Sequence, residues 1–154
     1  MRRHERQAAE STARQILSKG TYGVLCMAAG GDPYGVPLNY CYVPEENALF
    51  FHCATEGRKL DMIRENPRVV FVVTGKAHIA AERMTTYYES TMVFGTARLL
   101  TDEKEMKKRL VQLCKHLIAG WANNEEAIGG CLNGVAVLRL EIESLSAKTN
   151  AERA

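Results

Sequence analysis

Residues 36–67 read VPLNYCYVPEENALFFHCATEGRKLDMIRENP, and the local pattern changes twice within this stretch. Residues 36–43 are rich in β-forming side chains and predict a strand, which the turn residues 44–47 end. Residues 48–53 predict a second strand that pairs with the first as a hairpin. Apolar side chains then recur at helical spacing over residues 56–66, and the final proline ends that helix. The stretch therefore predicts two antiparallel strands followed directly by a short helix.

The same alternation of strands and turns continues on both sides of this stretch. The other expected elements are helices over 5–18 and from Asp102 to Gly120, and strands over 21–28, 68–74, 87–100 and 135–145. Short turns between neighbouring strands favour antiparallel pairing. Because a closed or split barrel protects the edges of such a sheet, we expect a mainly β fold, an antiparallel six-stranded split β-barrel with flanking helices.

Single residues carry further expectations about these elements. Gly95 predicts a bulge or bend within its strand. Asp102 is expected to cap the N-terminus of the helix that follows it, with Glu105 three residues further on as the second half of a box-like pair. Residues 75–85 fit neither a helical nor a strand pattern, and residues 121–133 read as a polar connection.

Length and charge exclude several classes of protein. The chain has 154 residues, which suits a single domain over residues 1–154. A formal net charge of +2 is too small to indicate binding to nucleic acid or to an anionic membrane. No apolar run approaches the roughly 20 residues that span a bilayer, and the charged first residues do not resemble a signal peptide. We therefore expect a cytoplasmic protein.

The cysteines favour reduced thiols over disulfides or zinc ligands. The chain has 5 of them, an odd number, and no Cys-x-x-Cys pair. They are Cys26, Cys41, Cys53, Cys114 and Cys131. Since a zinc site needs closely spaced pairs, we expect no metal.

The start of the helix over 56–66 carries the clearest binding signal. The first N–H groups of a helix lack backbone partners and carry partial positive charge, yet Arg58 and Lys59 add two cations there. This arrangement suits an anion such as a phosphate, and Gly57 lets the backbone approach it closely. The same residues also fit a short helix whose charges face solvent, so local chemistry leaves both interpretations open.

Three segments, in order, resemble the FMN-binding split-barrel family of pyridoxamine 5′-phosphate oxidase, and in particular its nitroimidazole-resistance branch. They are Pro37-Leu38-Asn39-Tyr40, Phe51 to Lys59, and Tyr88 to Ala97. The resemblance covers nearly the whole chain. It implies a homodimer that binds FMN at the interface between its subunits.

The resemblance also implies roles for individual residues. The implied cofactor-binding residues are Pro37, Leu38, Asn39, Tyr40, His52, Cys53, Arg58, Lys59 and Ser90. Of these, Arg58 and Lys59 would hold the flavin phosphate. His52 is also the candidate catalytic residue, because an imidazole beside a flavin can donate a proton or bind a substrate carboxylate or nitro group. A strand-end histidine bonded to a backbone carbonyl is the alternative. Tyr42 lines a substrate pocket or belongs to the core.

The implied activity is that of an FMN-dependent oxidoreductase. NADH or NADPH would bind transiently, since no Rossmann G-x-G-x-x-G is present, and a small organic molecule such as a nitroaromatic would accept the electrons. The oxidase's cations at the positions of Pro37 and near Tyr42 are missing here, which argues against vitamin B6 oxidation. The alternatives are a flavin-binding sensor, storage protein or carrier without robust turnover, and a related barrel that binds haem or a deazaflavin. Trp121 either covers a partner's flavin or anchors its own connection.

Overall fold

The computed structural model describes residues 4–118, 120–121, 128 and 134–150, and the fold is that of these residues. Eight strands in the described ranges form one sheet, and every pairing in it is antiparallel. The strands are β1 (Gln7–Ala8), β2 (Tyr22–Ala29), β3 (Asp32–Asn39), β4 (Cys41–Val43), β5 (Ala48–Cys53), β6 (Arg68–Ala80), β7 (Thr85–Leu99) and β8 (Ala136–Asn150). Their order is β3-β2-β6-β7-β8-β5-β4, and β1 pairs with β8.

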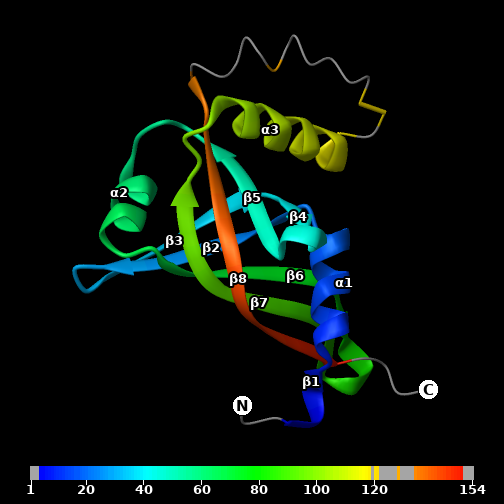
Figure 1. Ribbon diagram of the computed structural model, residues 1–154. Coiled ribbons are helices and arrows are strands. Elements are labelled where there is room, and N and C mark those ends of the chain that lie inside the picture. The colour runs from blue at the N-terminus through cyan, green and yellow to red at the C-terminus, as the bar shows by residue number, and fades with distance from the viewer. Residues whose placement is uncertain (1–3, 119, 122–127, 129–133, 151–154) are drawn as a thin grey trace.

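Three α-helices in the described ranges flank the strands. They are α1 (Glu10–Lys19), α2 (Arg58–Glu65) and α3 (Glu103–Leu117), and the short 3₁₀ helices of the same ranges include η1 (His4–Arg6), η2 (Pro44–Glu46) and η3 (Ala81–Arg83). Figure 1 shows α1 and α2 on opposite sides of the curved sheet, with α3 above the ends of β5 and β8. No helix in the described part of the chain has the length and apolar character that crossing a membrane requires.

The two ends of the strand order are consecutive in the sequence, which makes the sheet a split barrel. β3 ends at Asn39 and β4 begins at Cys41, so Tyr40 carries the chain from one edge of the sheet to the other. The predicted antiparallel split barrel with flanking helices is therefore confirmed. The strand count differs because the predicted strand over 36–43 breaks at Tyr40 and because β1 was not expected.

Several boundaries were predicted wrongly, each for a physical reason. The first helix begins at Glu10, because Gln7 and Ala8 pair with the far end of β8. The turn before β3 is only Gly30-Gly31, since positive φ angles of 57° and 88° allow a two-residue hairpin loop.

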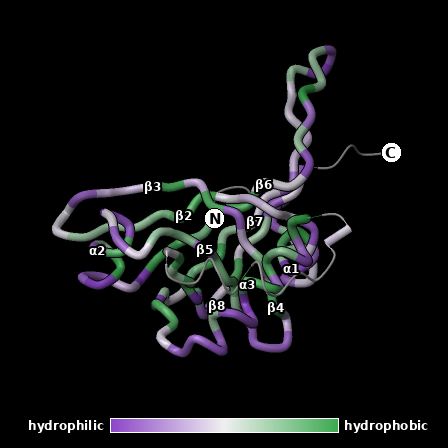
Figure 2. The backbone as a smooth tube through the Cα atoms, turned by 90° about the horizontal axis from the view of Figure 1, so that it is seen from above, coloured by the Kyte–Doolittle hydropathy of each residue, from purple (hydrophilic) through white to green (hydrophobic). Residues whose placement is uncertain are grey.

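Residues 75–85 continue β6, enter η3 and begin β7, so they belong to a hairpin arm. The arm projects beyond the rest of the sheet (Figure 2). The last strand also runs further than predicted, to Asn150, because β7 supplies a pairing edge for its whole length.

Aromatic rings fill the barrel, and a second cluster lies under α3. Phe71 makes edge contacts with Tyr40 and Phe51 at centroid distances of 5.1 and 4.9 Å. Phe50, on the opposite face of β5, packs with Leu110 and Leu113 of α3.

The expectations about Gly95 and Asp102 are confirmed. The register between β7 and β8 shifts between Phe94 and Gly95, and a side chain at Gly95 would collide with the carbonyl oxygen of Glu141. The Asp102 carboxylate accepts a hydrogen bond from the backbone N–H of Glu105 at 2.7 Å. The expected second half of the box-like pair does not form, because the Glu105 carboxylate bonds Arg109, a turn further along α3.

Candidate functional site: a notch between β3 and β5

The barrel opens where β3 and β5 separate. Cys41 of β4 pairs with Phe50 of β5, and continuing that register backwards would place Asn39 opposite His52 and Leu38 opposite Cys53. No ladder joins these residues, although β3 and β5 contact one another. Instead β3 pairs with β2, and the end of β5 pairs with β8. We call the opening between residues 37–39 and residues 52–53 the notch.

Each strand of the notch has one edge without a neighbouring strand. β3 is the last strand of the sheet on its side, and β4 covers β5 only as far as Phe50. Backbone N–H and C=O groups on such an edge need partners from water or from a ligand. The notch can therefore hold the polar edge of a flat molecule with main-chain groups, whatever the side chains are.

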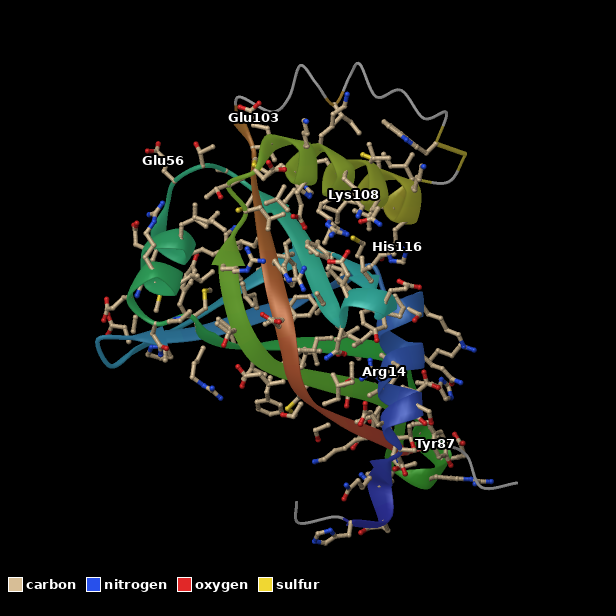
Figure 3. All side chains as sticks on the ribbon, in the orientation of Figure 1. Arg14, Glu56, Tyr87, Glu103, Lys108 and His116 are labelled. Carbon is tan, nitrogen blue, oxygen red and sulfur yellow. The ribbon has the colours of Figure 1, made fainter. Side chains whose placement is uncertain are left out.

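The first turn of α2 begins directly after the β5 side of the notch. Gly57 occupies the N-cap position with a φ of 122°, and no side chain caps the helix. The N–H groups of Leu60 and Asp61 bond the Gly57 carbonyl, whereas those of Arg58 and Lys59 have no helical acceptor. Glu56 lies on the exposed loop that leads into this turn (Figure 3). Two free N–H groups and a helix dipole therefore converge where an anion can bind.

The two cations of this turn reach opposite strands of the notch. Lys59 is half-buried, and its ammonium lies close to the thiol of Cys53 on β5. Burial raises the pKa of Cys53, and the nearby ammonium only partly offsets that rise, so the thiol stays protonated at neutral pH. Arg58 reaches β3, where its guanidinium lies 3.7 Å from a carboxylate oxygen of Asp32 and 5.0 Å from the ring centroid of Tyr34. The start of α2 therefore contacts both strands, and its contacts on β3 lie outside the notch.

His52 is the exposed polar side chain of the β5 edge. It pairs through its backbone with Val137 of β8. Within the described part of the chain, no hydrogen bond joins its imidazole to a backbone carbonyl, which was the alternative explanation for a histidine here. The ring is available to a ligand in the notch.

Three other expected site residues lie away from the notch. The Tyr40 side chain is fully buried, and its hydroxyl donates to the Leu17 carbonyl at 2.9 Å, so only its main chain can serve a ligand. The Tyr42 hydroxyl accepts a hydrogen bond from Arg14 of α1 (Figure 3), on the part of β4 that is paired with β5. Ser90 of β7 lies three strand spacings from β3, about 14 Å.

The remaining predictions concern cysteines, metals and Trp121. None of the four cysteines in the described ranges forms a disulfide, and Cys131 lies outside them. No group of three or more metal-ligating side chains occurs in the part of the chain that the structure describes. Trp121 is half-buried against the cluster under α3, which fits the anchoring role, although most of the connection over 121–133 lies outside the described residues.

Sequence reasoning missed Asp32 and Tyr34, the two β3 residues that contact Arg58. Both lie before residue 36, where the predicted strand begins. The signal was the Gly30-Gly31 pair, because two glycines can close a hairpin alone and leave residues 32–34 in the strand.

Together, the fold and the notch define a split-barrel protein whose split is flanked by an uncapped helix start with two cations. The family model described as pyridoxamine 5′-phosphate oxidase matches residues 9–149. The chain therefore belongs to this family. A search of the curated proteins finds no match.

Solved structures share the fold at low sequence identity. A flavocytochrome from Azotobacter vinelandii matches with a TM-score of 0.83 and 20% identity over 99% of this chain and 72% of its own. A candidate 5-nitroimidazole antibiotic resistance protein from Bacteroides thetaiotaomicron matches with a TM-score of 0.74 and 19% identity. The match covers 91% of this chain and 83% of its own. A FAD-binding protein from Mesorhizobium loti matches with a TM-score of 0.72 and 23% identity. The match covers 95% of this chain and 98% of its own.

Proposed function

We propose that the notch binds FMN and that the protein is a flavin-dependent oxidoreductase. The observation that carries the proposal is the position of the first turn of α2, which brings Arg58 to β3 and Lys59 to β5. A phosphate monoester matches this turn, because it can accept from two free N–H groups and two cationic side chains. Family membership supports the same cofactor.

The strand edges of the notch suit the rest of the cofactor. An isoalloxazine ring has a polar edge of N–H and C=O groups, and the unpaired edges at residues 37–39 and 52–53 offer complementary main-chain groups. Pro37 lacks an N–H, so its contribution to binding is limited to its carbonyl. The side chains of Leu38 and Cys53, both packed against the barrel core, close the inner side of this opening.

The bound flavin would supply hydride and electron transfer, and the chain's own residues would position reactants around it. His52 can hold a proton at either ring nitrogen and donate it to a bound substrate, or bond a carboxylate or nitro group. We propose NADH or NADPH as the transient donor and a small organic molecule, such as a nitroaromatic, as the acceptor.

A homodimer is part of the proposal, because the outer face of the sheet is apolar and uncovered. Val24, Met92 and Phe94 are each at least 37% exposed. The register places Val24 and Met92 in one row across the sheet, with Val72 between them. Isolated exposed hydrophobic residues are ordinary, but a contiguous face of this kind is typical of an interface. Ser90 lies on the same face, so in a dimer it would face the second subunit.

Spectroscopy of the full-length protein tests the proposed reaction. We expect bound flavin absorbance, bleaching by NADH or NADPH under anaerobic conditions, and return of the colour when a nitroaromatic acceptor is added. Flavin binding without bleaching would indicate a sensor, storage protein or carrier, and a Soret band would indicate haem; either result contradicts the proposed reaction.

Variants of two exposed histidines separate catalysis from binding. His52→Gln should keep the flavin but slow reoxidation by the acceptor about 10²- to 10⁴-fold, the usual contribution of a general acid. His78, on the hairpin arm, is the matched control, and His78→Gln should behave as the native protein. Equal rates for the two variants would remove His52 from the reaction.

A further inference from the structure

A second pocket lies between the end of α1 and the outer part of the β6–β7 pair. Its volume is about 450 Å³, within the range of small-molecule sites. Its charged lining residues are Lys19, Lys76 and Glu89. The lining therefore carries a net positive charge, and it contains no residue of the notch.

Local structure places both lysines at this pocket. Lys19 is the last residue of α1, where the carbonyl end of the helix dipole stabilises a cation. Lys76 belongs to an irregularity in which the register of β6 against β7 shifts between Thr74 and Ala77. Bulges of this kind redirect side chains and recur beside binding sites. Neither ammonium has a carboxylate partner within 4.0 Å in the described ranges, so both remain available to a ligand.

The other walls of the pocket suit a small planar acid. Hydroxyl groups of Thr12 and Thr74 supply neutral hydrogen-bond partners, and the ring of Tyr22, 54% exposed, supplies an apolar surface. A carboxylate or phosphate group suits a lining that contains two lysines, while the Glu89 carboxylate limits the negative charge that the pocket tolerates.

The pocket is connected to the notch through the backbone of Thr21. The Asn39 side chain and the Tyr40 N–H both donate to the Thr21 carbonyl, at 3.0 and 3.2 Å, and Thr21 lines the pocket. Thr21 therefore joins the β3 edge of the notch to the pocket wall.

We propose that this pocket binds small molecules that carry a carboxylate or phosphate group. In the proposed oxidoreductase this pocket would hold the second reactant, and that role rests on the proposed flavin function. Anion binding by the pocket does not depend on that function. A carboxylate acceptor and a phosphate-bearing donor share this chemistry, and separate probes distinguish them.

Equilibrium titration at low salt with inorganic phosphate and with benzoate tests the proposal. The background is Lys59→Ala, in which the phosphate site of the notch is weakened. Adding Lys19→Ala and Lys76→Ala should weaken binding of the better probe about tenfold or more, as loss of charge-assisted bonds predicts. Adding Lys104→Ala and Lys108→Ala, two exposed lysines of α3, should leave binding unchanged.

Two further variants define the ligand chemistry. Glu89→Gln should strengthen binding of both probes, because it removes a like charge from the pocket. Tyr22→Ala should weaken benzoate but not phosphate if the ring supports a planar acid. Absence of binding by both probes, or equal binding by the Lys19/Lys76 and Lys104/Lys108 variants, would overturn the proposal.

FMN titration of the same variants separates this proposal from the flavin function. Lys19→Ala with Lys76→Ala, in a chain that keeps Lys59, should leave FMN affinity unchanged. A protein that binds no flavin but binds phosphate through Lys19 and Lys76 would contradict the proposed function and support the second pocket.

Discussion

The ammonium of Lys59, in the first turn of α2, lies close to the thiol of Cys53 at the end of β5. The contact links the start of the helix to the strand edge across the intervening loop. With Arg58 held beside Asp32 and Tyr34 of β3, one helical turn is positioned by both strands that border the split. This arrangement is preformed, so an anion that binds here does not have to order the helix first.

Replacement of Lys59 by Met should weaken FMN binding about 10- to 150-fold, since a charge-assisted hydrogen bond contributes roughly 1.5–3 kcal/mol. Methionine keeps much of the side-chain length and removes the charge. Quenching of FMN fluorescence on titration measures the affinity. Lys104→Met is the control, on the first turn of α3. An affinity equal to that of the native protein would remove Lys59 from the phosphate site.

Asp32→Asn should strengthen FMN binding. The Asp32 carboxylate lies 3.7 Å from the Arg58 guanidinium and competes with a phosphate for it. Both side chains are largely exposed, so the gain should be modest, about threefold. The same titration, repeated at high salt, should show the difference shrinking. Weaker binding by the variant would indicate that Asp32 is needed to orient Arg58.

Much of the fold could be predicted because local patterns and global topology agree. The β4–β5 hairpin, α2 and β8 follow from turn residues and periodicity within short windows. The break at Tyr40 could not be predicted from its neighbours. It depends on a fully buried ring whose hydroxyl bonds the carbonyl of Leu17, a residue far away in the sequence.

The site was predicted less completely for the same reason. The anion signal at Gly57-Arg58-Lys59 is local and could be read from the sequence. The contact between Arg58 and β3 depends on how two hairpins meet, so no window of sequence contains it. The same limit explains why the contact of Tyr42 with Arg14 was not predicted, since the two residues are 28 positions apart in the sequence.

Acidification should destabilise the protein through Glu46. Burial alone would raise the pKa of this carboxyl, but hydrogen bonds and attraction from Arg109 and Arg139 lower it below its usual value. A carboxyl with a lowered pKa in the folded state stabilises the protein above about pH 4.3, the ordinary value for Glu, and the contribution is lost as pH falls through the folded-state pKa. Urea unfolding between neutral and acidic pH measures this dependence.

Glu46→Gln is the matched variant for that measurement. It should be less stable than the native protein at neutral pH, and its stability should fall less steeply on acidification. Equal slopes for the two proteins would contradict the role given to Glu46.

Phe94→Asp should convert a dimer into a monomer. Phe94 is 37% exposed on the apolar outer face of the sheet, where a charge facing a second subunit would be desolvated. Light scattering during gel filtration measures the mass. Ile118→Asp provides the control, because Ile118 is 47% exposed beyond the end of α3. Monomeric native protein, or a dimeric Phe94→Asp variant, would contradict the proposed interface.

The proposed function depends most directly on whether this chain holds a flavin at the start of α2. The decisive measurement is the visible absorbance of the protein after incubation with FMN and removal of free FMN by gel filtration, made in parallel on native protein and Lys59→Met. We predict stoichiometric flavin on the native protein and a large loss on the variant. Native protein that elutes without flavin, or a variant that retains it fully, would contradict the account.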